Sequence, residues 1–185
     1  MFSLRLDEPQ YTNAFTKFDE IDIRRNNLLT TLNVLPKEYS VSFEVFPTMF
    51  NGGGWTNVIH LTTGDDAGSY GARTPAVFFA MERRQLRIIS AISGNNNTIY
   101  NALGSRINVW TSVKIVQFKS GDTYTYRIFI NDTKKFQVVN NDPREFTNVK
   151  VYASDQWNTA QPGLIRNIII QGRNVHYFLD KLYVT

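Results

Sequence analysis

The chain has 185 residues, of which 42% are hydrophobic and 14% aromatic, so it is long and apolar enough to bury a core, and disorder is excluded as the default. Its formal charge is +4, and basic residues are spread along the chain, with Arg24-Arg25 and Arg83-Arg84 among the adjacent pairs, so we predict no nucleic-acid partner and no anionic membrane surface. The absence of cysteine excludes structural disulfides and thiolate metal sites.

Residues 1–27 are predicted to be an irregular lead-in whose strands pack on the core. Phe2, Leu4 and Leu6 alternate as in an opening strand, whereas Pro9 to Asp22 is rich in turn-forming and aromatic residues. Charged residues follow the start at once, so no signal peptide is recognised, and no apolar run approaches the ~18 residues of a membrane helix. No membrane insertion is therefore predicted.

A central stretch, residues 39–79, holds two strand-like runs and the start of a third, which flank a polar loop. In the first run apolar and polar side chains alternate, which is the period expected of a half-buried strand. The apolar set of that run is Tyr39, Val41, Phe43 and Val45. The loop, GDDAGSYGARTP, combines glycines with Asp65, Asp66, Tyr70 and Arg73. Binding groups concentrate on loops carried by rigid sheets, so this loop is the first candidate site.

Short apolar runs separated by turn residues continue to the end of the chain. The pattern predicts about a dozen strands at the 8–12-residue spacing that is typical of sandwiches. The later runs are 77–81, 86–92, 110–118, 124–130, 136–139, 149–153, 164–170 and 175–184. Turn chemistry lies between nearly every pair, which favours antiparallel neighbours. We therefore predict an all-β fold, a two-sheet antiparallel β-sandwich that forms a single domain over residues 1–185.

Four segments, taken in order, carry a resemblance to a known family. They read EYSVSFEVFPT at 38–48, WTNVIHLTTG at 55–64, VKVYASDQW at 149–157 and PGLIRNIII at 162–170. Over roughly residues 28–172 the chain resembles the laminin-G-like or concanavalin A-like sandwich, the lectin-type jelly roll. The resemblance implies two stacked sheets whose rim loops or concave face bind glycans or protein partners, often through a calcium ion.

Asp65 and Asp66 are the first candidate ligands for that ion. Calcium takes six to eight oxygen ligands, and the two carboxylates with carbonyls of the glycine-rich loop could give about four or five of them. A distant loop would supply the rest through Asp155 or Asp142, which matches the division between an early and a late loop that the resemblance implies. The alternative is that Asp65 and Asp66 form an Asx-type turn and bind no ion.

A second candidate site is one for carbohydrate, which needs an exposed ring and several fixed hydrogen-bonding groups. Trp157 stands in a polar loop beside Gln156 and Asn158, and Tyr70 and Arg73 could join from the other loop. A further tryptophan, at position 55, follows a run of three glycines. The alternative is that both tryptophans cap the ends of the core.

An enzymatic interpretation rests on one short segment. Glu20 and Asp22 echo the acidic strand of laminarinase-type hydrolases, which share the sandwich, but Arg24 and Arg25 stand where the second carboxylate of the required pair should be. We interpret the segment as chance and predict no enzymatic activity. His60 is interpreted as a hydrogen-bonded residue of a sheet face, because two histidines without cysteine make a zinc site improbable.

The sequence therefore predicts a lectin-like, non-enzymatic module that binds a glycan or glycoprotein through rim loops, with calcium as an assisting ion. The rival is a structural or cell-adhesion domain that binds a protein partner or a second copy along a sheet edge or face. N-glycosylation acceptor patterns at Asn96 and Asn131 favour an extracellular or cell-surface location.

Overall fold

The computed structural model describes residues 11–50, 54–80 and 82–173, and in these ranges it contains strands and no helix. The predicted all-β class is therefore confirmed. The strands are β1 (Thr12–Lys17), β2 (Ile21–Asp22), β3 (Leu28–Leu35), β4 (Glu38–Pro47), β5 (Trp55–Thr62), β6 (Ala76–Ala80), β7 (Gln85–Ile92), β8 (Asn95–Ala102), β9 (Thr111–Ser120), β10 (Thr123–Ile130), β11 (Thr133–Asn140), β12 (Phe146–Tyr152), β13 (Thr159–Ala160) and β14 (Gly163–Arg173).

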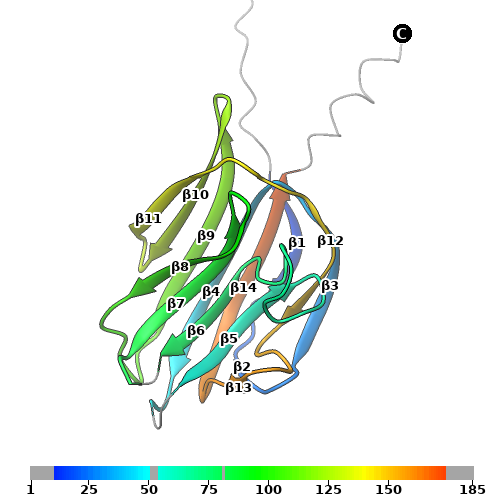
Figure 1. Cartoon of the computed structure of the whole chain (residues 1–185). Coiled ribbons are helices and arrows are strands. Elements are labelled where there is room, and N and C mark those ends of the chain that lie inside the picture. Colours follow the sequence, from blue (N-terminus) through cyan, green and yellow to red (C-terminus); the bar gives the residue numbers. More distant parts are fainter. Residues whose placement is uncertain (1–10, 51–53, 81, 174–185) are drawn as a thin grey trace, which may run out of the picture.

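The strands form two sheets of seven that face each other (Figure 1). The first sheet has the order β1-β14-β4-β9-β10-β11, with β2 added beside β14. The second has the order β3-β12-β5-β6-β7-β8, with β13 added beside β5. Every pairing among the described strands is antiparallel except that of β13 with β5. The predicted two-sheet antiparallel sandwich is thus confirmed.

The core lies between the two sheets and takes one alternating set of side chains from each strand. On β4 the predicted set Tyr39, Val41, Phe43 and Val45 is buried, because these residues point inward while Ser42 and Glu44 between them remain partly exposed. The second sheet contributes fully buried aliphatic side chains such as those of β5. The hydroxyl of Tyr126, which lies on β10 of the first sheet, is buried in this core and hydrogen-bonded to that of Ser90 on β7, so its polar group has a partner.

Two expected strands, at residues 2–6 and 175–184, lie outside the described residues. The segment that the sequence predicted to be turn-rich contains β1, which pairs with the edge of β14 through Phe15 opposite Ile170. Five of the six residues of β1 are polar or small, so the run shows little apolar alternation, and its backbone pairing with β14 fixes it instead. No helix that could span a membrane occurs among the described residues.

Candidate functional site

The two loops that carry the predicted site residues span residues 63–75 and 153–158 in the structure, and they meet over the outer face of the second sheet. The amide Nδ2 of Asn158 donates to Oδ1 of Asp66 at 3.1 Å, which joins the late loop to the early one. Beneath them lies His60 of β5, whose neighbour Leu61 faces the core, so the imidazole points to the outer side of the sheet. The loops cover it completely, since its exposed fraction is 0%.

His60 and Asp155 form a buried pair that fastens both loops to the sheet. Nδ1 of His60 lies 2.7 Å from Oδ2 of Asp155, and Nε2 lies 2.7 Å from the carbonyl oxygen of Ala72. Both neighbours are oxygen atoms, so each ring nitrogen of His60 has a hydrogen-bonding partner. Asp155 also accepts the backbone N–H groups of Trp157 at 2.9 Å and Asn158 at 2.7 Å. Asp155 therefore organises its own loop as well as the junction.

The electrostatics of Asp155 follow from these contacts. Burial alone raises the pKa of Asp155, but the hydrogen bonds it accepts from His60 and Asn158 outweigh that effect and hold the pKa below its ordinary value. The carboxylate is therefore ionised at neutral pH. His60, which the sequence predicted to be a hydrogen-bonded residue of a sheet face, is its principal side-chain partner.

The predicted calcium ligands are brought together only in part. One ligand atom each of Asp66, Asp155 and His60 lies within 4.8 Å of the others. Asp65 is not in this group: its carboxylate accepts the N–H of Gly68 at 2.9 Å and the hydroxyl of Ser69 at 2.7 Å within its own turn. The turn chemistry weighed as the alternative is therefore present at Asp65. As these side chains stand, N–H donors surround the oxygens of Asp155, and they do not offer the six to eight free oxygens that calcium takes.

Arg73 and Tyr70 hold their loop in place. Nε of Arg73 donates to the carbonyl of Asp66 at 2.8 Å, and Nη1 donates to Oδ1 of Asn97 on β8 at 2.8 Å. The hydroxyl of Tyr70 donates to the carbonyl of Asp142 at 2.9 Å, and a guanidinium stacks on its ring. Both side chains thus contact protein groups along most of their length, which fixes the shape of the loop.

Gln156, Trp157 and Asn158 form the exposed part of the junction. Trp157 is half-buried, with the edge of its ring against His60 at 5.8 Å and Tyr152 at 6.5 Å between centroids. The side chain of Gln156 is exposed, so it is free to meet a ligand. Trp157 therefore combines the two roles weighed from the sequence, since one part caps the His60 pair and another faces solvent.

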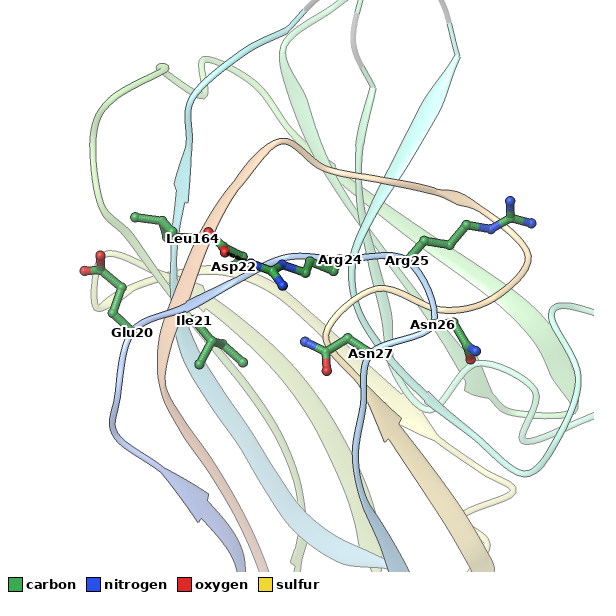
Figure 2. A pocket seen from close by; sticks show the side chains of 8 residues that line it. All are labelled: Glu20, Ile21, Asp22, Arg24, Arg25, Asn26, Asn27 and Leu164. Carbon is green, nitrogen blue, oxygen red and sulfur yellow. Dashed lines mark hydrogen bonds and ion pairs between the residues drawn. The ribbon is translucent and has the colours of Figure 1, made fainter.

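A groove of about 630 Å³ lies next to this junction, and sequence reasoning did not predict it (Figure 2). The backbone N–H groups of Asn26 and Asn27 donate to the carbonyls of Asp155 at 2.9 Å and Ser154 at 3.1 Å, which ties the groove to the late loop. Arg25 adds two bonds to the carbonyl of Gln156, at 3.0 and 2.8 Å. The groove is lined by Glu20, Ile21, Asp22, Arg24, Arg25, Asn26, Asn27 and Leu164.

The charges of the groove show what it can do chemically. Figure 2 shows the Arg24 side chain extended toward Asp22, with which it forms an ion pair, while Glu20 points outward at the far end. The side chain of Asn27, also in the lining, lies below Arg24 in this view and is directed toward the side of Ile21. The described lining contains no third carboxylate beside Glu20 and Asp22. The groove thus presents hydrogen-bond donors and acceptors that hydroxyl groups can meet.

Comparison with known proteins identifies the fold. The sequence matches no protein-family model and no curated protein. A carbohydrate-binding module, the CBM40 of a Ruminococcus gnavus sialidase bound to α2,3-sialyllactose, superposes with a TM-score of 0.58 and 12% identity over 88% of this chain and 94% of that one. Domain 4 of the arabinanase AbnA of Geobacillus stearothermophilus, in complex with arabinotriose, gives 0.51 and 17% over 77% and 66%.

The receptor-binding domain of botulinum neurotoxin type G superposes with a TM-score of 0.53 and 16% identity. The match covers 90% of this chain, which spans 44% of the toxin domain. The β-sandwich of this chain is therefore one that carbohydrate-binding modules also adopt. At these identities the likeness concerns the fold, and the sites have to be argued from this chain's own residues.

Proposed function

We propose that the protein is a non-enzymatic carbohydrate-binding module of the laminin-G-like or concanavalin A-like type, which holds a glycan or glycoprotein at its rim. The observation that carries the proposal is the junction of the two loops at Asn158 and Asp66, which brings exposed amides and part of an indole ring beside the groove. Sugars present C–H faces to rings and hydroxyls to amides and carboxylates, and this surface offers both kinds of contact.

The shared fold supports the proposal in a general way. The CBM40 and the arabinanase domain are described with sugars bound, and each is built on the same sandwich. In this chain Gln156 and Asn27 are the groups best placed to meet hydroxyls, because the first is exposed and the second lines the groove. We place the protein outside the cell or at its surface, where such glycans occur.

A glycan panel followed by titration of the best ligand tests the proposal. We expect Gln156→Ala and Asn27→Ala each to weaken binding by roughly three- to tenfold, since each removes one or two hydrogen bonds to hydroxyls. Asn33→Ala, at an exposed asparagine of β3 away from the groove, is the matched control and should bind as the unaltered protein does. A blank panel, or equal affinity in all four proteins, would contradict the rim site.

Calcium assistance stays a prediction and has its own test. An ion held by Asp66 and Asp155 would have to replace the N–H donors of His60 and Asn158. If it binds, the melting temperature should rise in calcium chloride relative to a chelator, because a ligand of the native state stabilises it. Asp66→Asn should abolish the rise. Identical melting curves with and without calcium would remove the ion from the proposal and leave the sugar site standing.

A further inference from the structure

The outer face of the first sheet carries a second, separate feature, on β9 and β10. Side chains alternate along both strands, so one set faces the core and the other faces outward. Arg127 pairs with Val116, and Phe129 pairs with Lys114, so these outward residues stand side by side across the two strands. Val116 and Phe129 are only partly exposed although no other sheet covers them. Neighbouring apolar side chains on an outer face are a feature of binding surfaces.

These residues line an open cavity of about 300 Å³, whose full lining is Lys114, Val116, Phe118, Arg127, Phe129 and Asp132. Its size is at the lower end for small-molecule sites, which fits one sugar ring and not a longer stretch of polymer. The lining has three apolar side chains, those of Val116, Phe118 and Phe129, and three ionic ones, those of Lys114, Arg127 and Asp132. The cavity can therefore contact both an apolar face and a charged group of one ligand.

The side chain of Arg127 is held in this cavity by contacts with neighbouring strands. Its guanidinium lies over the ring of Phe118 at 4.6 Å, and its Nε donates to Oε1 of Gln137 on β11 at 2.9 Å. Lys134 donates to the same oxygen at 3.2 Å, which holds Gln137 in turn. Among the described residues no protein group accepts a bond from the two terminal nitrogens of Arg127. The planar fork is thus oriented in advance, and its bidentate edge is available.

We propose that this cavity binds a carboxylate-bearing pyranose, such as a uronic or sialic acid unit. The terminal nitrogens of Arg127 pair with the carboxylate, and the ammonium of Lys114 adds a second positive charge at the border. Phe129 supplies an apolar face for the C–H groups of the ring, and Asp132 is an acceptor for hydroxyls.

The composition of the lining separates this ligand from its competitors. A neutral sugar would leave the terminal nitrogens of Arg127 without an ionic partner, whereas a carboxylate gains charge-assisted hydrogen bonds there. A nucleic-acid chain would meet Asp132 and lacks a run of cations to follow. The cavity lies on the first sheet, whereas the rim junction lies on the second, so this site does not depend on the proposed rim function.

The test is a titration of the full-length, ¹⁵N-labelled protein with four probes: methyl glucuronide, the methyl glycoside of N-acetylneuraminic acid, methyl glucoside and acetate. We expect at least one acidic glycoside to shift the amide signals of β9 and β10 and to bind at least about tenfold more tightly than glucoside and acetate, as the loss of a charged hydrogen-bond pair implies. The affinities of the two acidic glycosides, compared with each other, show whether a uronic or a sialic unit is preferred.

Arg127→Gln should weaken the acidic ligand by at least about tenfold, since it removes the bidentate donor. Arg106→Gln, at an exposed arginine of the loop between β8 and β9, makes the same change of net charge and should leave affinity unaltered. Melting curves of both variants check that they fold. Equal binding of glucoside, equal loss in both variants, or signal shifts confined to the rim would overturn the inference. If the Gln156 and Asn27 variants bind neutral sugars with the affinity of the unaltered protein, that result concerns only the rim site.

Discussion

At the scale of single residues, the feature that decides the candidate site is the ionised Asp155 placed beside His60. Both side chains have an exposed fraction of 0%, so each needs partners for its polar atoms. Asp155 accepts from four N–H groups, and its loop has no other carboxylate. A buried group of this kind stabilises the fold chiefly because its removal leaves several donors unsatisfied.

Asp155→Ala is accordingly expected to lower the free energy of unfolding by about 3 kcal/mol, the scale for breaking a buried charged pair. Denaturant titration followed by circular dichroism measures the loss. Asp142→Ala is the control, because its carboxylate is bonded to Arg144 on the surface, where such pairs contribute little. A loss for Asp155→Ala no larger than that of the control would show that the buried pair is not an anchor.

The same residue predicts a dependence on acid. Because its pKa is lower in the folded protein than in the unfolded chain, Asp155 contributes stability above the unfolded pKa of about 4, and that contribution disappears as the pH falls through the folded pKa. The charged or titratable groups that face it are His60 and, through Asn158, Asp66. Between pH 7 and about pH 3, the melting temperature of the unaltered protein should fall more than that of Asp155→Asn. Equal decreases in the two proteins would contradict this.

At the scale of elements, one glycine connects the early loop to the core. Gly71 has a φ of +109°, and a Cβ there would lie 2.8 Å from the ring of Phe146 on β12. Its carbonyl accepts the N–H of Thr63 at 3.1 Å, so the loop closes on itself at this point. The backbone must therefore approach β12 closely in a conformation that side chains rarely adopt. The close approach of Gly71 to β12 positions the next residue, Ala72, whose carbonyl oxygen is the partner of Nε2 of His60.

Gly71→Ala should cost more than about 2 kcal/mol of stability, because strain at a positive φ and a steric overlap add together. Gly121→Ala, at φ +61° with no atom within 4 Å of the added Cβ, separates the two effects and should cost about 1 kcal/mol. The comparison requires only chemical denaturation of both variants. Similar losses would mean that the loop can move away from Phe146.

At the scale of the whole molecule, the outer surfaces of the two sheets differ. Loops cover the outer face of the second sheet around His60, whereas the outer face of the first sheet is open over β9 and β10. The outermost strands of the two paths are β1 and β11 in the first sheet, and β3 and β8 in the second. On β11 the exposed lysines at 134 and 135 discourage pairing with another chain, since a second copy would bring like charges together.

We therefore expect a monomer in gel filtration over a hundredfold range of protein concentration. This is the outcome that distinguishes a glycan-binding module from the rival adhesion domain. Replacement of both lysines by threonine should increase self-association, which light scattering would detect. An oligomer that forms with rising concentration in the unaltered protein, together with a blank glycan panel, would favour the rival.

The sequence was sufficient for the sandwich because burial imposes a period of two that can be counted, as on Tyr39 and Val41 of β4. For the partner of the Asp66 loop it left Asp155 and Asp142 open, because spacing along the chain does not show which distant loop comes close. It did not distinguish Asp65 from Asp66, because the two are adjacent and only the backbone turn decides which carboxylate faces the junction. The groove beside Gln156 was missed, since it arises where backbone segments far apart in sequence meet, and no side-chain pattern records that.

The antiparallel pairing of Thr12 with Gly172 places the start of β1 and the end of β14 next to each other. The 11 residues of β14 then span roughly 30 Å to the end that pairs with β2, where the groove lies. Attachment of this module to a bead, a sensor chip or a host scaffold through that strand pair would present the groove outward. Copies strung in tandem through the same pair could engage several branches of one target at once, with avidity set by the spacers between them.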